Sequence, residues 1–200
     1  LVARQFGPLL NRQALPQDAV QGGRLVAITG ARGGVGASTI AANLSWYLGA
    51  EARRHTILLD TDLHRGVCAM LLGAKSGSGL RTALETPSRI DELFVERVSQ
   101  PVVDRLHVLA GEERLADQPN YAAGGAARLT EALRRRYNFV VADLPFTGQP
   151  LHRDLLHLAQ QRVLVMVPTL ASIRDSLRLL ARVGRSEERR VGKECRSRWS

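Results

Sequence analysis

The clearest chemical signal in the sequence is a glycine-rich turn between Thr29 and Thr39, which reads TGARGGVGAST. Glycines let a backbone approach a ligand closely, and their N–H groups bind phosphate together with the start of a following helix. The turn follows a short apolar run, 25–29, and precedes a helical pattern that starts at Ser38. This is the context that such loops require. We therefore predict a phosphate-binding loop in preference to a plain structural turn.

Acidic residues follow two other apolar runs. Asp60 ends the run 56–60, Asp62 comes two residues later, and Asp143 follows the run 139–142. In parallel sheets, ligands bind at the carboxyl ends of the strands, where the glycine turn and these acids all fall. One such Asp alone would be interpreted as a strand end or a turn cap. Three of them after a glycine-rich loop favour a nucleotide site.

Apolar runs alternate with helical patterns along the middle of the chain. The predicted strands are 25–29, 56–60, 106–110, 139–142 and 162–167, and the predicted helices are 38–49, 79–85, 89–98, 125–136, 151–160 and 172–183. Nearly continuous apolar strands that alternate with helices predict an α/β fold, in which helices cover both faces of a mostly parallel sheet.

Length and composition are those of one globular domain, with 200 residues of which 44% are apolar. The longest apolar run, 67–72, is far too short for a membrane span. Two cysteines, Cys68 and Cys195, make neither a disulfide framework nor a zinc site and favour a reducing compartment. The formal charge of +9 suggests an anionic partner. The bases are nearly all arginine, however, as GC-rich coding DNA would produce, so nucleic acid is not the partner we expect.

The two ends of the chain differ from its middle in composition and periodicity. Residues 1–23 carry prolines and glycines with little periodicity and are interpreted as a linker. Residues 185–200, RSEERRVGKECRSRWS, resemble an in-frame translation of a sequencing adapter, so we expect a non-native tail there. Without the six basic and three acidic residues of that segment, the formal charge is +6. An incomplete nucleotide-binding domain is therefore expected over 24–184.

The turn also resembles the cofactor loop of short-chain dehydrogenases, TGxxxGxG. Those enzymes carry a catalytic Tyr-x-x-x-Lys pair. The tyrosines here, Tyr47, Tyr121 and Tyr137, are followed four positions on by glutamate, glycine and valine. The dehydrogenase interpretation therefore lacks its acid–base pair within this sequence and is an alternative of low weight.

A second resemblance covers 24–184. The loop RGGVGAST is similar to the deviant Walker A motif, KGGxGK[ST], of the ParA/MinD ATPases. Asp60-Thr61-Asp62 matches the family's DxD after the second strand, and FVVADLP, 139–145, matches a Walker B strand. Together, in this order and spacing, the three motifs are much more specific than any one of them. The resemblance implies a P-loop NTPase fold of three α/β/α layers, with ATP and Mg²⁺ as cofactors.

Two departures from the family pattern narrow the resemblance. The signature lysine that reaches across a dimer is Arg32 here, and the lysine that holds the β- and γ-phosphates is Ala37. Loss of both resembles the CpaE/TadZ branch, whose members assemble and localise Flp/Tad-type pilus secretion systems. That implies a homodimer around nucleotide, pilus machinery proteins as partners and a cytoplasmic location, at the inner membrane or cell pole, with peripheral membrane association. An active ParA/MinD-type positioning ATPase is the alternative.

The resemblance also implies a role for each motif residue. Ser38, Asp60 and Asp143 would hold Mg²⁺, Asp62 would orient the attacking water, and Arg32 would act in trans on the partner's nucleotide. Without the charge of a lysine at position 37, hydrolysis is expected to be weak or absent. The residues expected to contact the nucleotide are Arg32, Gly33, Gly34, Val35, Gly36, Ala37, Ser38 and Thr39.

The remaining polar residues have plainer interpretations. The five histidines show no ligand spacing and are expected at the surface or in packing positions, and Cys68 is expected to be a small apolar filler. The arginine runs 53–54 and 134–136 are interpreted as solvated helix ends rather than as binding surfaces.

Overall fold

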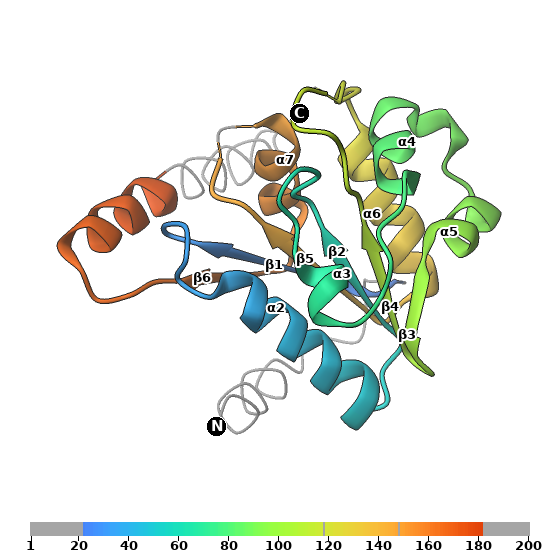
Figure 1. The fold of residues 1–200 in the computed structure, drawn as a ribbon, viewed down its shortest axis with the longest axis horizontal. Coiled ribbons are helices and arrows are strands. Elements are labelled where there is room, and N and C mark those ends of the chain that lie inside the picture. Colours follow the sequence, from blue (N-terminus) through green and yellow to red (C-terminus); the bar gives the residue numbers. More distant parts are fainter. Residues whose placement is uncertain (1–21, 118, 148, 182–200) are drawn as a thin grey trace, which may run out of the picture.

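A six-stranded sheet forms the centre of the protein (Figure 1). The computed structural model describes residues 22–117, 119–147 and 149–181. The strand order is β3-β4-β2-β5-β1-β6, and every pairing is parallel except that of β3 with β4. The strands are β1 (Arg24–Gly30), β2 (Thr56–Asp60), β3 (Gln100–Val103), β4 (Leu106–Ala110), β5 (Phe139–Leu144) and β6 (Gln161–Val165).

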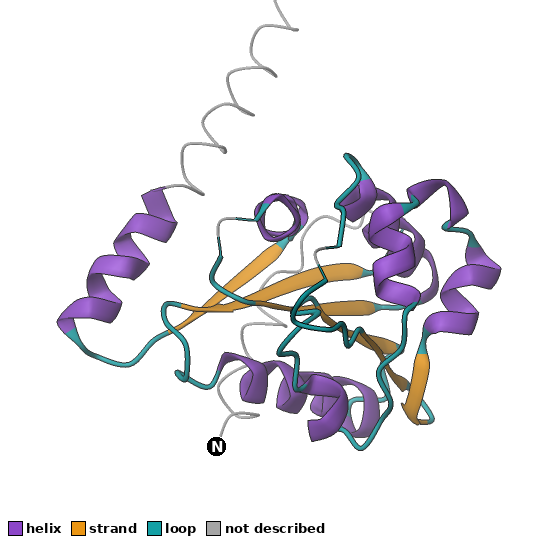
Figure 2. Ribbon diagram, turned by 45° about the horizontal axis from the view of Figure 1, so that its top comes forward, coloured by secondary structure: helices purple, strands orange, loops and turns teal. Residues whose placement is uncertain are grey.

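Helices cover both faces of this sheet (Figure 2). They are α2 (Ala37–Trp46) with its π-helical extension η1 (Tyr47–Glu51), α3 (Cys68–Leu71), α4 (Gly79–Glu85), the 3₁₀ helix η2 (Pro87–Arg89), α5 (Glu92–Val98), α6 (Gly125–Arg136) and α7 (Pro150–Leu158). Residues 170–181 form a further helix beyond β6. Within the described ranges, no helix combines the length and the apolar character that a bilayer crossing demands.

Alternate residues of each strand enter two separate cores. On β1, Val26 and Ile28 pack with α2 and α3, whereas Leu25 and Ala27 pack with α4, α5, α6 and α7. This two-residue alternation is the geometry of a pleated strand, and burial on both sides explains why the strands read as continuous apolar runs. The predicted three-layer α/β/α arrangement is confirmed.

Differences from the predicted elements are local. The predicted helix 89–98 is interrupted, because Asp91 caps α5 by accepting a hydrogen bond from the Phe94 N–H at 2.6 Å. Strand β3 was not predicted: it has four residues, includes Pro101 and pairs antiparallel with an irregular register. Short helix α3 was not predicted either.

The predicted segment boundaries fall at the margins of the described residues. Of the predicted linker, residues 1–21 lie outside the described ranges, as do 182–184 and the predicted tail 185–200. Gly23 is tied to the domain, because its N–H donates to the Arg134 carbonyl at 2.7 Å. The domain limits 1–23, 24–184 and 185–200 stay predictions.

Candidate nucleotide-binding site

The glycine-rich turn joins the end of β1 to the start of α2. Gly34 and Gly36 have φ of 79° and 89°, a region that side chains with a Cβ rarely adopt. Gly36 is the N-cap of α2, which has neither a side-chain cap nor an acid in its first turn. Within the described ranges, the first N–H groups of the helix receive no side-chain cap, and they lie at the positive end of its dipole. Such an end suits a phosphate.

One cavity of about 680 Å³ brings the loop and the acids together. Residues 32–39 line it, and so do Asp62 and Asp143. All eight residues predicted to contact the nucleotide are therefore in one place, with two of the three predicted acids. Asp60 is buried and does not line the cavity.

Strand register brings Asp60 and Asp143 together. Strands β2 and β5 are adjacent and parallel, and Asp60 pairs with Asp143 in their register. Thr61 reinforces the junction, because its hydroxyl donates to the Asp143 carbonyl at 2.7 Å. The two carboxyl ends of the strands thus form one rigid acidic corner below the phosphate loop.

Cys68 completes this corner, which the sequence did not predict. Its backbone N–H donates to Asp60 Oδ2 at 2.9 Å, and its thiol donates to Asp143 Oδ2 at 3.3 Å. The ligand atoms of Asp60, Cys68 and Asp143 lie within 4.8 Å of one another, close enough to share a metal ion. Cys68 is buried, as expected of a filler, but its thiol contacts the acids.

Burial raises the pKa of both carboxyl groups when no cation is bound. Desolvation raises the pKa of Asp60 to about 6, and repulsion by Asp143 adds to the rise. Desolvation also raises the pKa of Asp143, against hydrogen bonds from Ser38 and Cys68 that lower it. A divalent cation would reverse these shifts, because it favours the charged carboxylates. The donor set of Ser38, Asp60 and Asp143 is thus suited to Mg²⁺.

The contribution of Asp60 to the stability of the metal-free protein should fall as pH rises from about 4 to 6. Over this window the unfolded chain loses the Asp60 proton while the folded protein keeps it, so folding is disfavoured by roughly 2–3 kcal/mol. Urea unfolding in EDTA, compared between wild type and Asp60→Asn, measures this contribution. Asp104→Asn, at an exposed position, is the control. A stability difference from Asp60→Asn that does not change over the window would contradict the assignment.

Gly66 packs against the acidic corner so closely that a methyl group has no room. A Cβ there would lie 2.5 Å from Asp60 Oδ2 and 2.6 Å from the Asp62 carbonyl oxygen. We expect Gly66→Ala to cost about 1–3 kcal/mol of stability and to weaken nucleotide binding, because both acids must move. Gly77→Ala is the matched control, since its Cβ would meet nothing within 4 Å. If both variants changed nucleotide binding equally, the acidic corner would not be part of the nucleotide site.

Asp62 is held in place by its own loop. Its Oδ1 accepts hydrogen bonds from the N–H groups of His64 at 3.2 Å and Arg65 at 3.0 Å, and Arg65 Nε lies 3.8 Å from Oδ2. Asp62 lines the nucleotide cavity and also a neighbouring cavity of about 500 Å³. This placement is consistent with its predicted role beside the phosphates, where it would orient a water molecule.

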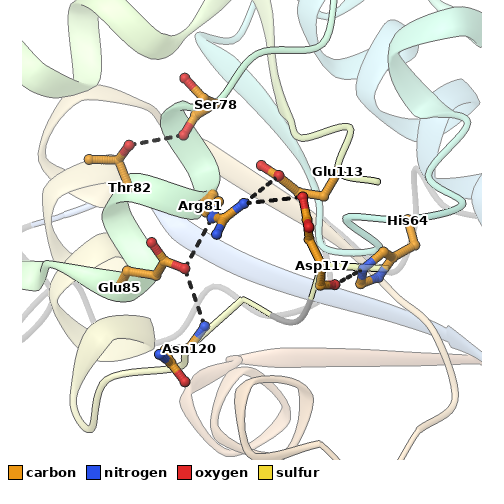
Figure 3. A network of polar contacts seen from close by, with 8 residues as sticks. All are labelled: His64, Ser78, Arg81, Thr82, Glu85, Glu113, Asp117 and Asn120. Carbon is orange, nitrogen blue, oxygen red and sulfur yellow. Dashed lines mark hydrogen bonds and ion pairs between the residues drawn. The ribbon is translucent and has the colours of Figure 1, made fainter. Parts of the chain in front are cut away.

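An arginine network supports the loop that walls the neighbouring cavity (Figure 3). Arg81 on α4 lies 3.0 Å from Glu85 and 2.7 Å from Glu113. His64 Nε2 lies 2.8 Å from the Asp117 carbonyl oxygen. The segment after β4 is therefore joined both to α4 and to the loop that carries Asp62.

Arg32 contacts its own chain. Its guanidinium lies 2.8 Å from Asp175 Oδ2, on the helix 170–181, and half of its side chain is exposed. Arg174 and Arg178 also approach Asp175, and the hydrogen bond from Arg174 is the main reason that the pKa of Asp175 is lowered. Asp175 had no sequence signal, because it joins the site only through tertiary packing.

His152 is a further residue near the site. It is buried, its Nδ1 lies 2.5 Å from the Thr147 hydroxyl, and desolvation lowers its pKa. It lines the cavity next to the nucleotide cavity. Its predicted role as a packing residue is consistent with this burial.

The curated proteins that the chain resembles are MinD and Soj proteins. No protein-family model matches the chain. It is 27% identical over 173 residues to the septum site-determining protein MinD of Synechocystis, covering 85% of this chain and 62% of that protein. It is 32% identical over 149 residues to the chromosome-partitioning ATPase Soj of Thermus thermophilus, covering 74% and 55%. The chain spans 55–62% of the length of the curated relatives it matches.

Solved structures share the fold. A ParA-family ATPase from Chlorobium tepidum superimposes with a TM-score of 0.71 at 22% identity, covering 80% of this chain and 66% of that one. MinD of Pyrococcus horikoshii, solved with Mg-ADP, superimposes with a TM-score of 0.69 at 21% identity, covering 82% and 65%. The fold is therefore the α/β fold of ParA/MinD P-loop NTPases, as predicted.

Proposed function

Because its homologues are ATPases of the MinD and Soj/ParA type, we propose that the chain binds Mg-ATP in the cavity lined by residues 32–39. We further propose that it dimerises around the nucleotide, hydrolyses it weakly or not at all, and acts as a localisation and assembly factor of a Flp/Tad-type pilus secretion system. The observation that carries the proposal is an intact phosphate loop and acidic corner in which Ala37 replaces a lysine.

The binding half of the proposal rests on backbone chemistry. The phosphate cradle consists mainly of N–H groups at the start of α2 and of glycines, so Ala37 does not remove it. Ser38 and Asp143 would hold Mg²⁺, with Asp60 in support. The bound ion would neutralise phosphate charge and polarise the β–γ linkage.

The weak-turnover half rests on a missing charge. Electrostatic stabilisation of the transferring phosphoryl group dominates catalysis of this kind, and the alanine side chain supplies none. In this proposal Asp62 would orient a water molecule, and Arg32 would contribute a permanent charge of the kind that binds phosphate bidentately. Slow nucleotide turnover would let the protein act as a binding switch.

Arg32 links the nucleotide to dimerisation in this proposal. Before it could act on a partner's nucleotide, Arg32 would have to leave Asp175. We expect Asp175→Asn to lower the concentration at which Mg-ATP induces dimers by about fivefold, because a half-exposed ion pair is worth about 1 kcal/mol or less. Analytical ultracentrifugation with and without Mg-ATP measures this, with Asp104→Asn as the control. Dimers that form less readily in Asp175→Asn would contradict this role.

The role in pilus secretion is the most specific part of the proposal. The departures from both family lysines, at Arg32 and Ala37, together with the DLP of residues 143–145 at the end of β5, support it. Genomic sequence on either side of the coding region is the test. Neighbouring pilus-secretion genes would support the role, and cell-division or partition genes would contradict it.

An active positioning ATPase is the second candidate. The relatives named above are septum-site and chromosome-partitioning proteins, and Asp62 retains its place at the cavity. This candidate predicts brisk phosphate release that Asp62→Ala abolishes.

A further inference from the structure

A hollow of about 730 Å³ lies at the edge of the sheet opposite the phosphate loop. It forms where β1 and β5 begin, η1 ends and α6 ends. Among the residues that the structure describes, five arginines line it and no acidic residue does. We call it the arginine hollow; its arginines are Arg24, Arg54, Arg134, Arg135 and Arg136.

The elements that meet here are far apart in the sequence. The run 134–136 ends α6, and arginines at a helix C-terminus are stabilised by the helix dipole. Arg54 lies three residues after the end of η1, so a helix end can account for its position as well. Arg24 starts β1 and has no helix end to explain its charge. The sequence predicted only solvated helix ends for the arginine runs, whereas in the structure Arg54 and the run 134–136 line one concavity.

Compensation of these charges is incomplete. Arg135 pairs with Glu131 and Arg136 lies 3.5 Å from Glu96, whereas Arg134 donates to the Gly23 carbonyl. Within the described ranges, neither Arg24 nor Arg54 has an ion-pair or side-chain hydrogen-bond partner. Like charges gathered in a concavity repel one another, and an anion that enters it removes the repulsion.

We infer that the arginine hollow is a binding site for a phosphate-bearing small molecule of nucleotide size. Guanidinium groups bind phosphate oxygens bidentately. Tyr47 and Phe139, both half-buried, line the same hollow and offer aromatic surface beside the charges. Its volume is close to the 680 Å³ of the nucleotide cavity. A concave site of this size suits a compact ligand better than a flat membrane surface or a long duplex.

The site is separate from the phosphate loop. Strand β1 runs from Arg24 at the hollow to Gly30 at the loop, a span of about 20 Å at the rise of an extended strand. A ligand in the hollow would therefore leave the nucleotide cavity free, and the proposal does not depend on ATP binding there.

Calorimetric titration of the full chain with pyrophosphate tests the site, at low and high salt. The test variant is Arg24→Ala with Arg54→Ala, whose side chains have no polar partner in the part of the chain that the structure describes. The control is Arg89→Ala with Arg97→Ala, two exposed arginines outside the hollow that change the charge equally. Pyrophosphate that also enters the phosphate loop gives a component common to all three proteins.

The wild type and the control are expected to bind pyrophosphate at the arginine hollow. The test variant should lose this binding or show an affinity at least about tenfold lower. Pyrophosphate should also raise the Tm of the wild type and the control more than that of the test variant. Equal pyrophosphate binding by all three proteins would overturn the proposal. So would an arginine-dependent component seen only with phosphatidylglycerol vesicles or single-stranded DNA and not with pyrophosphate.

Discussion

Ala37→Lys is expected to tighten Mg-ATP binding by about 10- to 100-fold, the value of one charge-assisted contact to phosphate. Position 37 is the first residue of α2 and lines the nucleotide cavity. A lysine there would place a positive charge beside the β- and γ-phosphates, on a cradle that already supplies the N–H groups. Phosphate release should rise as well, since that charge also stabilises the transferring group. Calorimetry and a phosphate-release assay measure the two effects.

Ala37→Gln is the matched control, because its side chain is long and polar but uncharged. It should leave ATP affinity within a few-fold of the wild type. If lysine and glutamine at position 37 have the same effect, or if neither changes the affinity, the loop does not hold phosphates in the manner argued.

Asp143→Asn is expected to separate stability from function. Asp143 is buried beside Asp60, and desolvation raises its pKa. Removing an imperfectly compensated buried charge should stabilise the metal-free protein by about 1 kcal/mol or more. The same change should weaken Mg²⁺-dependent ATP binding by about 10- to 100-fold, the usual cost of losing a residue that supports a bound metal. Urea unfolding in EDTA and ATP titration with Mg²⁺ measure the two effects.

Asp104→Asn should change neither quantity, because Asp104 is exposed and far from the sheet's carboxyl edge. An Asp143→Asn protein that binds Mg-ATP as tightly as the wild type would show that the acidic corner does not serve the metal. Lower stability of that variant in EDTA would instead show that the charge is compensated in the metal-free protein.

Much of the fold was predictable because the strands are buried on both faces. The apolar runs that end at Asp60 and before Asp143 are marked by composition alone, and a parallel sheet brings their ends together. The edge strand β3 was not predictable, since four residues with a proline carry little apolar pattern. The break at Asp91 comes from its N-cap hydrogen bond, which the helical periodicity of 89–98 does not reveal.

The site likewise contains residues that the sequence predicts and residues that only the structure reveals. The loop and its acids are local motifs, so residues 32–39, Asp60, Asp62 and Asp143 could be named from their spacing. Cys68, Asp175 and the arginine hollow arise from contacts between segments far apart in the chain. Such contacts leave no periodic signal in one sequence. The functional partners that depend on tertiary packing therefore became visible only in the structure.

The most direct test of the central claim combines two assays on the wild-type chain. Mg-ATP binding is measured by calorimetry, and phosphate release is followed in the same preparation alongside Asp62→Ala. We predict saturable, Mg²⁺-dependent ATP binding with phosphate release that barely exceeds that of the variant. Brisk release that Asp62→Ala abolishes, or an absence of ATP binding by a folded protein, would contradict the account.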